Sequence, residues 1–157
     1  MAGEMSTAGA TLQYAVEATQ GVRPTTGYKI IPGCTSTPDF NPAPETLDVT
    51  DLSDEEYRRY IPALKSVGES MAFGFNLSTS MRTAWGNLVT TFETAFAAEK
   101  SVWFAVVHTR DPEAYYFNGE PVKLGMGAMN VGEVRVMDAY IVPNKIEGWA
   151  VKPTTTP

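Results

Sequence analysis

Five prolines divide residues 32–65, and this segment constrains the fold more than any other part of the chain. They stand at positions 32, 38, 42, 44 and 62. Proline has no backbone N–H and biases the residue before it towards extended backbone, so no helix or single continuous strand can run through the segment. We therefore expect a long loop at residues 38–65, between a strand at 28–31 and another at 71–77.

This loop is acidic but keeps many large apolar side chains. A solvated linker gains nothing from such groups, because they stay exposed to water. A loop of this length inside a compact domain usually has a function. We expect the loop to dock on a partner, and a neighbouring copy of the same chain is the simplest candidate. The candidate contact residues are Phe40, Leu47, Val49, Leu52, Tyr57, Arg58, Arg59, Tyr60, Ile61 and Leu64.

Two periodic patterns predict the regular elements on either side of the loop. Apolar and polar residues alternate at 12–17 and at 71–78, as they do in half-buried strands. Residues 80–99 instead carry one apolar stripe at helical spacing, with Thr79 or Ser80 as the expected N-cap. The stripe consists of Met81, Trp85, Leu88, Val89, Phe92, Ala95 and Phe96.

The C-terminal half predicts further strands. Residues 102–108 are apolar almost throughout, which is typical of a strand covered on both faces. Asn118-Gly119 predicts a two-residue hairpin turn. Residues 133–142 predict a long strand with a bulge at Met137-Asp138, followed by a turn at Pro143-Asn144 and a last strand at 146–151.

Together these elements predict a single domain over residues 1–157. It is expected to be mainly β, a β-sandwich with one packed α-helix. Residues 1–10 are expected to form a flexible N-terminal arm, and residues 152–157 a frayed tail.

Charge and hydropathy limit the partners. The chain has 12 basic and 18 acidic residues, which give a net charge of −6 at pH 7. Binding of nucleic acid needs clustered Lys and Arg, so we do not expect it. The longest apolar run, residues 102–107, is far too short to cross a bilayer, and residues 1–10 lack the pattern of a signal peptide. We expect a soluble protein, made in a cytoplasm and without a membrane partner.

Residues with catalytic or metal-binding chemistry are sparse. His108 is the only histidine, and no serine lies in a Gly-x-Ser-x-Gly motif, so neither a His-pair metal site nor a hydrolase triad is indicated. Asp48, Asp51, Asp54 and Glu56 could attract calcium, but their spacing is not that of an EF-hand. Solvated or interface carboxylates are the favoured interpretation. Cys34, the only cysteine, is expected to be a buried or half-buried thiol. We expect no enzymatic activity, no cofactor and no metal.

The order of several short segments carries a family resemblance. They are Ile30-Ile31-Pro32-Gly33, Pro38-Asp39-Phe40, residues 48–52, residues 60–64 and Gly68-Glu69, followed by the helix around Trp85 and by residues 143–149. In this order the chain resembles the major tail tube protein of long, flexible-tailed (siphovirus-like) bacteriophages.

The resemblance implies a structural subunit of the virion tail, made in the host cytoplasm. Six copies would form a ring, and stacked rings would form a hollow tube with an inner β-barrel. Residues 1–10 and 38–65 would be the assembly elements. The implied partners are other copies of the chain, the tape-measure protein, the tail terminator and the distal tail protein.

The same resemblance implies that DNA passes through the lumen without specific binding. A lumen biased towards negative charge would repel the phosphate backbone. The candidate lumen-facing charges are Glu69, Glu133, Arg135 and Asp138.

Two other functions remain open from the residues. A monomeric β-sandwich module that binds a partner or decorates a capsid would fold the 38–65 loop onto its own body. A small β-barrel that carries a ligand, or acts as an enzyme, would have a pocket with convergent polar groups.

Overall fold

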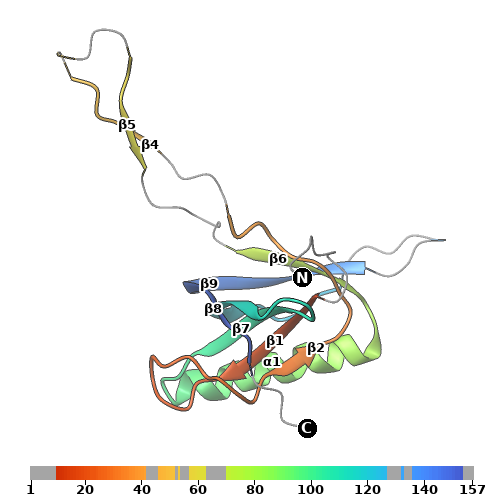
Figure 1. The fold of residues 1–157 in the computed structure, drawn as a ribbon. Helices are drawn as coiled ribbons and strands as arrows, with labels where there is room; N and C mark the ends of the chain where they lie inside the picture. The colour runs from red at the N-terminus through yellow and green to blue at the C-terminus, as the bar shows by residue number, and fades with distance from the viewer. Residues whose placement is uncertain are drawn as a thin grey trace.

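The computed structural model describes residues 10–41, 46–51, 53, 57–62, 70–126, 132 and 136–153. Figure 1 shows their arrangement. In chain order the elements are β1 (Ala10–Val16), β2 (Lys29–Ile31), β3 (Cys34–Ser36), β4 (Thr46–Asp48), β5 (Tyr60–Pro62), β6 (Met71–Asn76), α1 (Thr79–Ala97), β7 (Val102–His108), β8 (Glu113–Pro121) and β9 (Val136–Val151). The expectation of a mainly β protein with one helix is confirmed for these residues.

Seven of the described strands form one sheet, in the order β2-β1-β7-β8-β9-β6-β3. All neighbours within it run antiparallel. The remaining strands, β4 and β5, form a separate two-stranded sheet. The predicted β-sandwich is not confirmed, because the main strands belong to one continuous sheet.

The short corner between β2 and β3 nearly closes this sheet. These strands lie at opposite ends of the strand order, yet only Pro32 and Gly33 separate them in sequence. The sheet must therefore curl until its two ends meet. Gly33 has a φ of 86°, and a Cβ at this position would lie 2.9 Å from the carbonyl oxygen of Asn76. Glycine fits here because the left-handed backbone and the close approach both disfavour a side chain.

The last strand differs from its prediction. Residues 136–151 form one strand, not two strands with a turn at Pro143-Asn144. The pairing of β9 with β8 shifts twice, between Tyr116 and Phe117 and between Asn118 and Gly119. Proline has no N–H to donate, and an irregular position in the ladder tolerates it. The bulge predicted at Met137-Asp138 is wrong, since both residues stay in register with β6.

The predicted turn at Asn118-Gly119 is also wrong. Both residues lie inside β8, paired with Trp103 and Val102 of β7. A two-residue hairpin turn needs positive φ angles, and neither residue has one. The chain reverses earlier, where the N–H of Asp111 donates to the carbonyl of His108 at 3.2 Å.

The helix matches its prediction closely but has a different N-cap. Ser78, not Thr79 or Ser80, is the N-cap, and its hydroxyl accepts a hydrogen bond from the N–H of Met81 at 3.1 Å. Most of the apolar stripe packs on the sheet, with Met81, Trp85, Leu88 and Ala95 buried. Phe96 is the exception, 67% exposed in the last turn.

Aromatic rings fill the interior of the curled sheet. Phe117 of β8 stacks on Phe104 and on Phe73, with ring centroids 5.2 and 5.9 Å apart. Phe40, from the segment after β3, lies 5.3 Å from Phe117. Trp85 packs where the core meets helix α1, with its ring centroid 5.8 Å from that of Phe75. Such pairs each contribute roughly 0.5–1.5 kcal/mol beyond their area burial.

A buried carboxylate accepts several hydrogen bonds on the outer face of β1 and β7. Glu17 is only 2% exposed, and it accepts hydrogen bonds from the indole Nε1 of Trp103 at 3.0 Å and from the N–H groups of Ser101 and Gly21 at 2.9 and 3.2 Å. The strand at 102–108 is therefore covered on both faces at Val102, Trp103, Phe104 and Ala105, as its sequence predicted.

Candidate assembly surface

The β4–β5 hairpin projects away from the seven-stranded sheet (Figure 1). Its two strands pair only with one another, from Thr46 opposite Pro62 to Asp48 opposite Tyr60. This hairpin lies within the 38–65 loop of the sequence prediction, so part of that loop has regular structure.

Hydrogen bonds continue the hairpin beyond its strands. The N–H of Val49 donates to the carbonyl of Arg59 at 2.9 Å. The N–H of Arg59 donates to the hydroxyl of Thr50 at 2.8 Å. The N–H of Thr50 donates to the carboxylate of Asp48 at 2.9 Å. These hydrogen bonds, like the strand pairing, lie within the hairpin itself.

Two ion pairs join the two sides of the hairpin. Arg59 lies 3.0 Å from the carboxylate of Asp51, and Arg58 lies 3.6 Å from that of Asp48. Hydrogen bonds from the hydroxyl and the N–H of Thr50 lower the pKa of Asp48 below its ordinary value. Exposed pairs of this kind contribute little to stability, so their effect on register and partner choice matters more.

Large apolar side chains of the hairpin face water. Exposed fractions are 55% for Leu47, 38% for Val49, 80% for Tyr57 and 53% for Tyr60. A side chain of this kind gains free energy only when another surface covers it. Leu47 pairs with Ile61 and Asp48 with Tyr60, so the hairpin presents apolar side chains on both faces, and the described part of the same chain leaves them open.

The other predicted contact residues divide into two groups. Phe40 is half-buried on the core and contacts the rings of Tyr115, Phe73 and Phe117. These contacts account for Phe40 within its own chain, so we leave it out of the assembly surface. Leu52 and Leu64 lie outside the described residues, as does the side chain of Ile61, whose backbone belongs to β5.

The candidate lumen charges are mostly outside the described residues as well. Glu69, Glu133 and Arg135 are not described. Asp138 is exposed on β9, where exposed and buried residues alternate from Val136 to Val142. Ala10, the last residue of the expected N-terminal arm, belongs to β1. Lys152, the first residue of the expected frayed tail, donates its N–H to the carbonyl of Pro112 at 3.2 Å.

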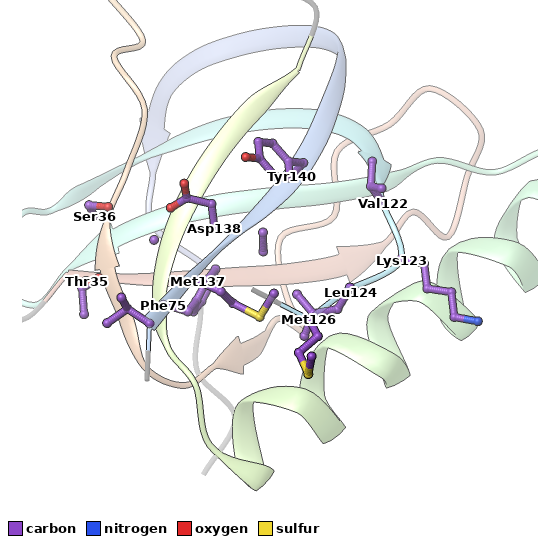
Figure 2. Close-up of a pocket in the computed structure, with 14 residues that line it drawn as sticks. Thr35, Ser36, Phe75, Val122, Lys123, Leu124, Met126, Met137, Asp138 and Tyr140 are labelled. Carbon is purple, nitrogen blue, oxygen red and sulfur yellow. The ribbon is translucent and has the colours of Figure 1, made fainter. Parts of the chain in front are cut away.

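A second surface, which the sequence reasoning missed, lies on the outer face of β3, β6 and β9. A groove of about 680 Å³ runs from Thr35 and Ser36, across Gly74, to the segment 122–126. In Figure 2, Asp138 and Tyr140 lie at one end of the lining, while Leu124, Met126 and Met137 gather near the helix. Four exposed apolar side chains line the groove: Val122, Met126, Val136 and Tyr140. We call this surface the β6–β9 groove. The signal for it in the sequence is the alternation along β9, which places Val136, Asp138 and Tyr140 on one face.

The segment 122–126 is fixed at its start by two hydrogen bonds. The N–H of Val122 donates to the carbonyl of Tyr140 at 2.9 Å. The indole Nε1 of Trp85 donates to the carbonyl of Val122 at 2.9 Å. Helix α1 therefore helps to position one wall of the β6–β9 groove.

Cys34, His108 and Asp111, whose side chains are capable of catalysis or metal binding, line one cavity of about 530 Å³ beside Trp149. Within the described part of the chain, no three His, Cys, Asp or Glu side chains gather where a metal ion could be held. His108 ends β7 and accepts, through Nδ1, a hydrogen bond from the N–H of Arg110 at 3.1 Å. Cys34 is half-buried, as expected, and burial raises the pKa of its thiol. The described residues also include no helix with the length and hydropathy to cross a bilayer.

Comparison of the sequence with protein-family models and with curated proteins found no match.

Proposed function

We propose that this chain is a structural subunit of a bacteriophage tail tube, which assembles with copies of itself into stacked hexameric rings. The hollow tube would let DNA pass during ejection without binding it specifically. The proposal assigns no catalytic role to any residue.

The exposed apolar side chains of the β4–β5 hairpin are the observation that carries this proposal. Leu47, Val49, Tyr57 and Tyr60 are all more than one third exposed in the isolated chain. Fully burying one Leu or Val side chain is favourable by about 1.5–3 kcal/mol. Contacts repeated around a ring and between rings would add up these favourable free energies until their sum exceeds the free-energy cost of association.

The overall fold and charge are compatible with this role. A nearly closed sheet with one helix can offer edges and faces to neighbouring copies, and closure of sheets across a ring would remove exposed edges. A net charge of −6 per copy disfavours adhesion of DNA.

The rival functions receive less support from the described residues. A monomeric binding or capsid-decorating module would be expected to fold the whole 38–65 loop onto its own body, as Phe40 is folded, whereas β4 and β5 pair only with one another. A ligand carrier would need an open interior, whereas stacked rings of Phe73, Phe104 and Phe117 occupy the inside of the sheet.

Electron microscopy of the purified chain at increasing concentration tests the proposal. We expect rings with a central channel, and tubes at high concentration. A protein that stays monomeric in sedimentation and shows no rings or tubes at any concentration would contradict it.

A further inference from the structure

The β6–β9 groove is an apolar surface without a cover. Exposed fractions there are 44% for Val122, 79% for Met126, 57% for Val136 and 44% for Tyr140. Such side chains occur singly on most proteins, but a contiguous group on one concave surface marks an interaction site. The four side chains come from two neighbouring segments, since the N–H of Val122 bonds to the carbonyl of Tyr140.

The floor of the β6–β9 groove is formed by small residues. Gly74 is buried at the middle of β6, and a Cβ there would collide with the hydroxyl of Ser36. The side chains of Thr35 and Ser36 occupy the space beside Gly74, so they and not the backbone of β6 form this part of the floor.

Charge narrows the choice of occupant. Asp138 is exposed in the lining of the groove, and no ion pair involves it in the described part of the chain. Lys123 is exposed in the same lining, so the groove suits an apolar segment that carries charges of both signs and can place a cation on Asp138.

The β4–β5 hairpin has this composition. It exposes Leu47 on one face and Tyr60 on the other, and it carries Asp48 and Arg58, whose side chains lie 3.6 Å apart, with that of Arg58 74% exposed. In Figure 1 the hairpin points away from its own sheet, so it is placed to reach another molecule.

We propose that the β6–β9 groove of one copy receives the β4–β5 hairpin of a second copy. The apolar side chains of the hairpin cover Val122, Met126, Val136 and Tyr140, and Arg58 pairs with Asp138 across the contact. This assignment rests on the proposed self-assembly and names the surface that the hairpin binds.

A reciprocal charge swap tests the pairing. Arg58→Glu and Asp138→Arg each place like charges across the contact, so each should weaken assembly about tenfold, a change of about 1.4 kcal/mol. The double variant, Arg58→Glu with Asp138→Arg, should restore assembly to within about threefold of wild type. Sedimentation velocity gives the assembled fraction, and circular dichroism checks that each variant is folded.

The matched control combines Arg58→Glu with Asp111→Arg. Asp111 lies in the β7–β8 turn, outside the lining of the β6–β9 groove. Rescue by Asp138→Arg but not by Asp111→Arg supports the pairing. Equal behaviour of the two double variants would overturn the proposed groove, even if wild type forms tubes.

Chemical cross-linking gives a test that does not depend on charge. In a Cys34→Ser background, chains with Leu47→Cys are mixed with chains with Val136→Cys and treated with a short bismaleimide. We expect cross-linked pairs that contain one chain of each kind, and none when Glu113→Cys, at the exposed start of β8 and outside the lining of the groove, replaces Val136→Cys.

The outcomes separate the two proposals. Tubes without cross-links at Val136 would show that the hairpin binds elsewhere or that another partner occupies the groove, and the tail tube proposal would stand. A chain that neither assembles nor cross-links would remove both proposals.

Discussion

The N–H of Val49 donates a hydrogen bond to the carbonyl of Arg59 at 2.9 Å, one residue beyond β4 and one before β5. This bond extends the two-stranded ladder towards the tip of the hairpin. A hairpin that is already ordered loses less conformational entropy on binding than a flexible loop does. In the proposed assembly, the order of this hairpin should therefore matter as well as its apolar side chains.

Thr50→Ala should weaken assembly without changing the stability of the main sheet. The hydroxyl of Thr50 accepts the N–H of Arg59 at 2.8 Å, and a hydrogen bond of this kind contributes about 1 kcal/mol net. We expect an approximately fivefold rise in the concentration needed for assembly, measured by light scattering. Thr83→Ala, on an exposed position of α1, is the control and should leave that concentration unchanged. An unaltered concentration for Thr50→Ala would contradict a role for hairpin order.

Trp85→Phe should destabilise the domain and loosen the wall of the β6–β9 groove. It removes the N–H that donates to the carbonyl of Val122 at 2.9 Å, and an unpaired buried acceptor costs about 1–3 kcal/mol. We expect the free energy of unfolding in urea to fall by about that amount. Faster amide exchange at residues 123–126 than in wild type should accompany the loss. Unchanged exchange there would mean that Trp85 does not hold the segment.

Gly119→Ala and Gly86→Ala should change stability in opposite directions. A Cβ at Gly119 would lie 2.7 Å from the carbonyl oxygen of Val142, whereas a Cβ at Gly86 would meet nothing within 4 Å. Gly86 lies inside α1, where alanine is favoured over glycine by about 1 kcal/mol. Thermal unfolding should show a lower Tm for Gly119→Ala and a higher Tm for Gly86→Ala. Tolerance of alanine at both positions would contradict the close approach of β8 and β9.

Glu17 should make stability depend on acid. Burial alone would raise the pKa of its carboxyl, but hydrogen bonds from Trp103, Ser101 and Gly21 outweigh burial and lower it below 4.5. The folded state therefore favours the carboxylate. Its contribution is fully present above pH 4.5 and is lost as the pH falls through the lowered pKa.

Urea unfolding of wild type and Glu17→Gln between pH 7 and pH 3 measures this contribution. The variant should be less stable by about 1–3 kcal/mol at pH 7, and the difference from wild type should shrink as the pH falls. Glu113→Gln, at an exposed position, should show no such convergence. A difference that stays constant with pH would contradict the role given to the carboxylate.

Local patterns predicted several elements well. The alternation at 71–78 corresponds to strand β6, and the stripe from Met81 to Ala95 corresponds to the buried face of α1. Residues 102–108 were predicted with the bounds that the structure has. In these elements the apolar period and the tertiary packing require the same arrangement, so local information suffices.

Contacts between distant segments decided what the sequence could not show. Asn118-Gly119 has the residues of a turn, but β7 and β9 flank it on both sides and keep it extended. Pro143 suggested a break, yet the register of β9 shifts beside it and the strand continues. The β6–β9 groove joins β3, β6, β9 and residues 122–126, which are too far apart in sequence for any local pattern to connect.

Sedimentation velocity of a hairpin variant tests the central claim most directly. Leu47→Ser combined with Tyr60→Ser removes two exposed apolar side chains from the hairpin, and Phe96→Ser removes one from the exposed end of α1 as a control. All three proteins should have similar Tm values, since none of these side chains is buried in the core. We predict that wild type and Phe96→Ser form large assemblies, whereas the hairpin variant stays monomeric. A hairpin variant that assembles as wild type does would contradict the claim that the β4–β5 hairpin joins copies of this chain.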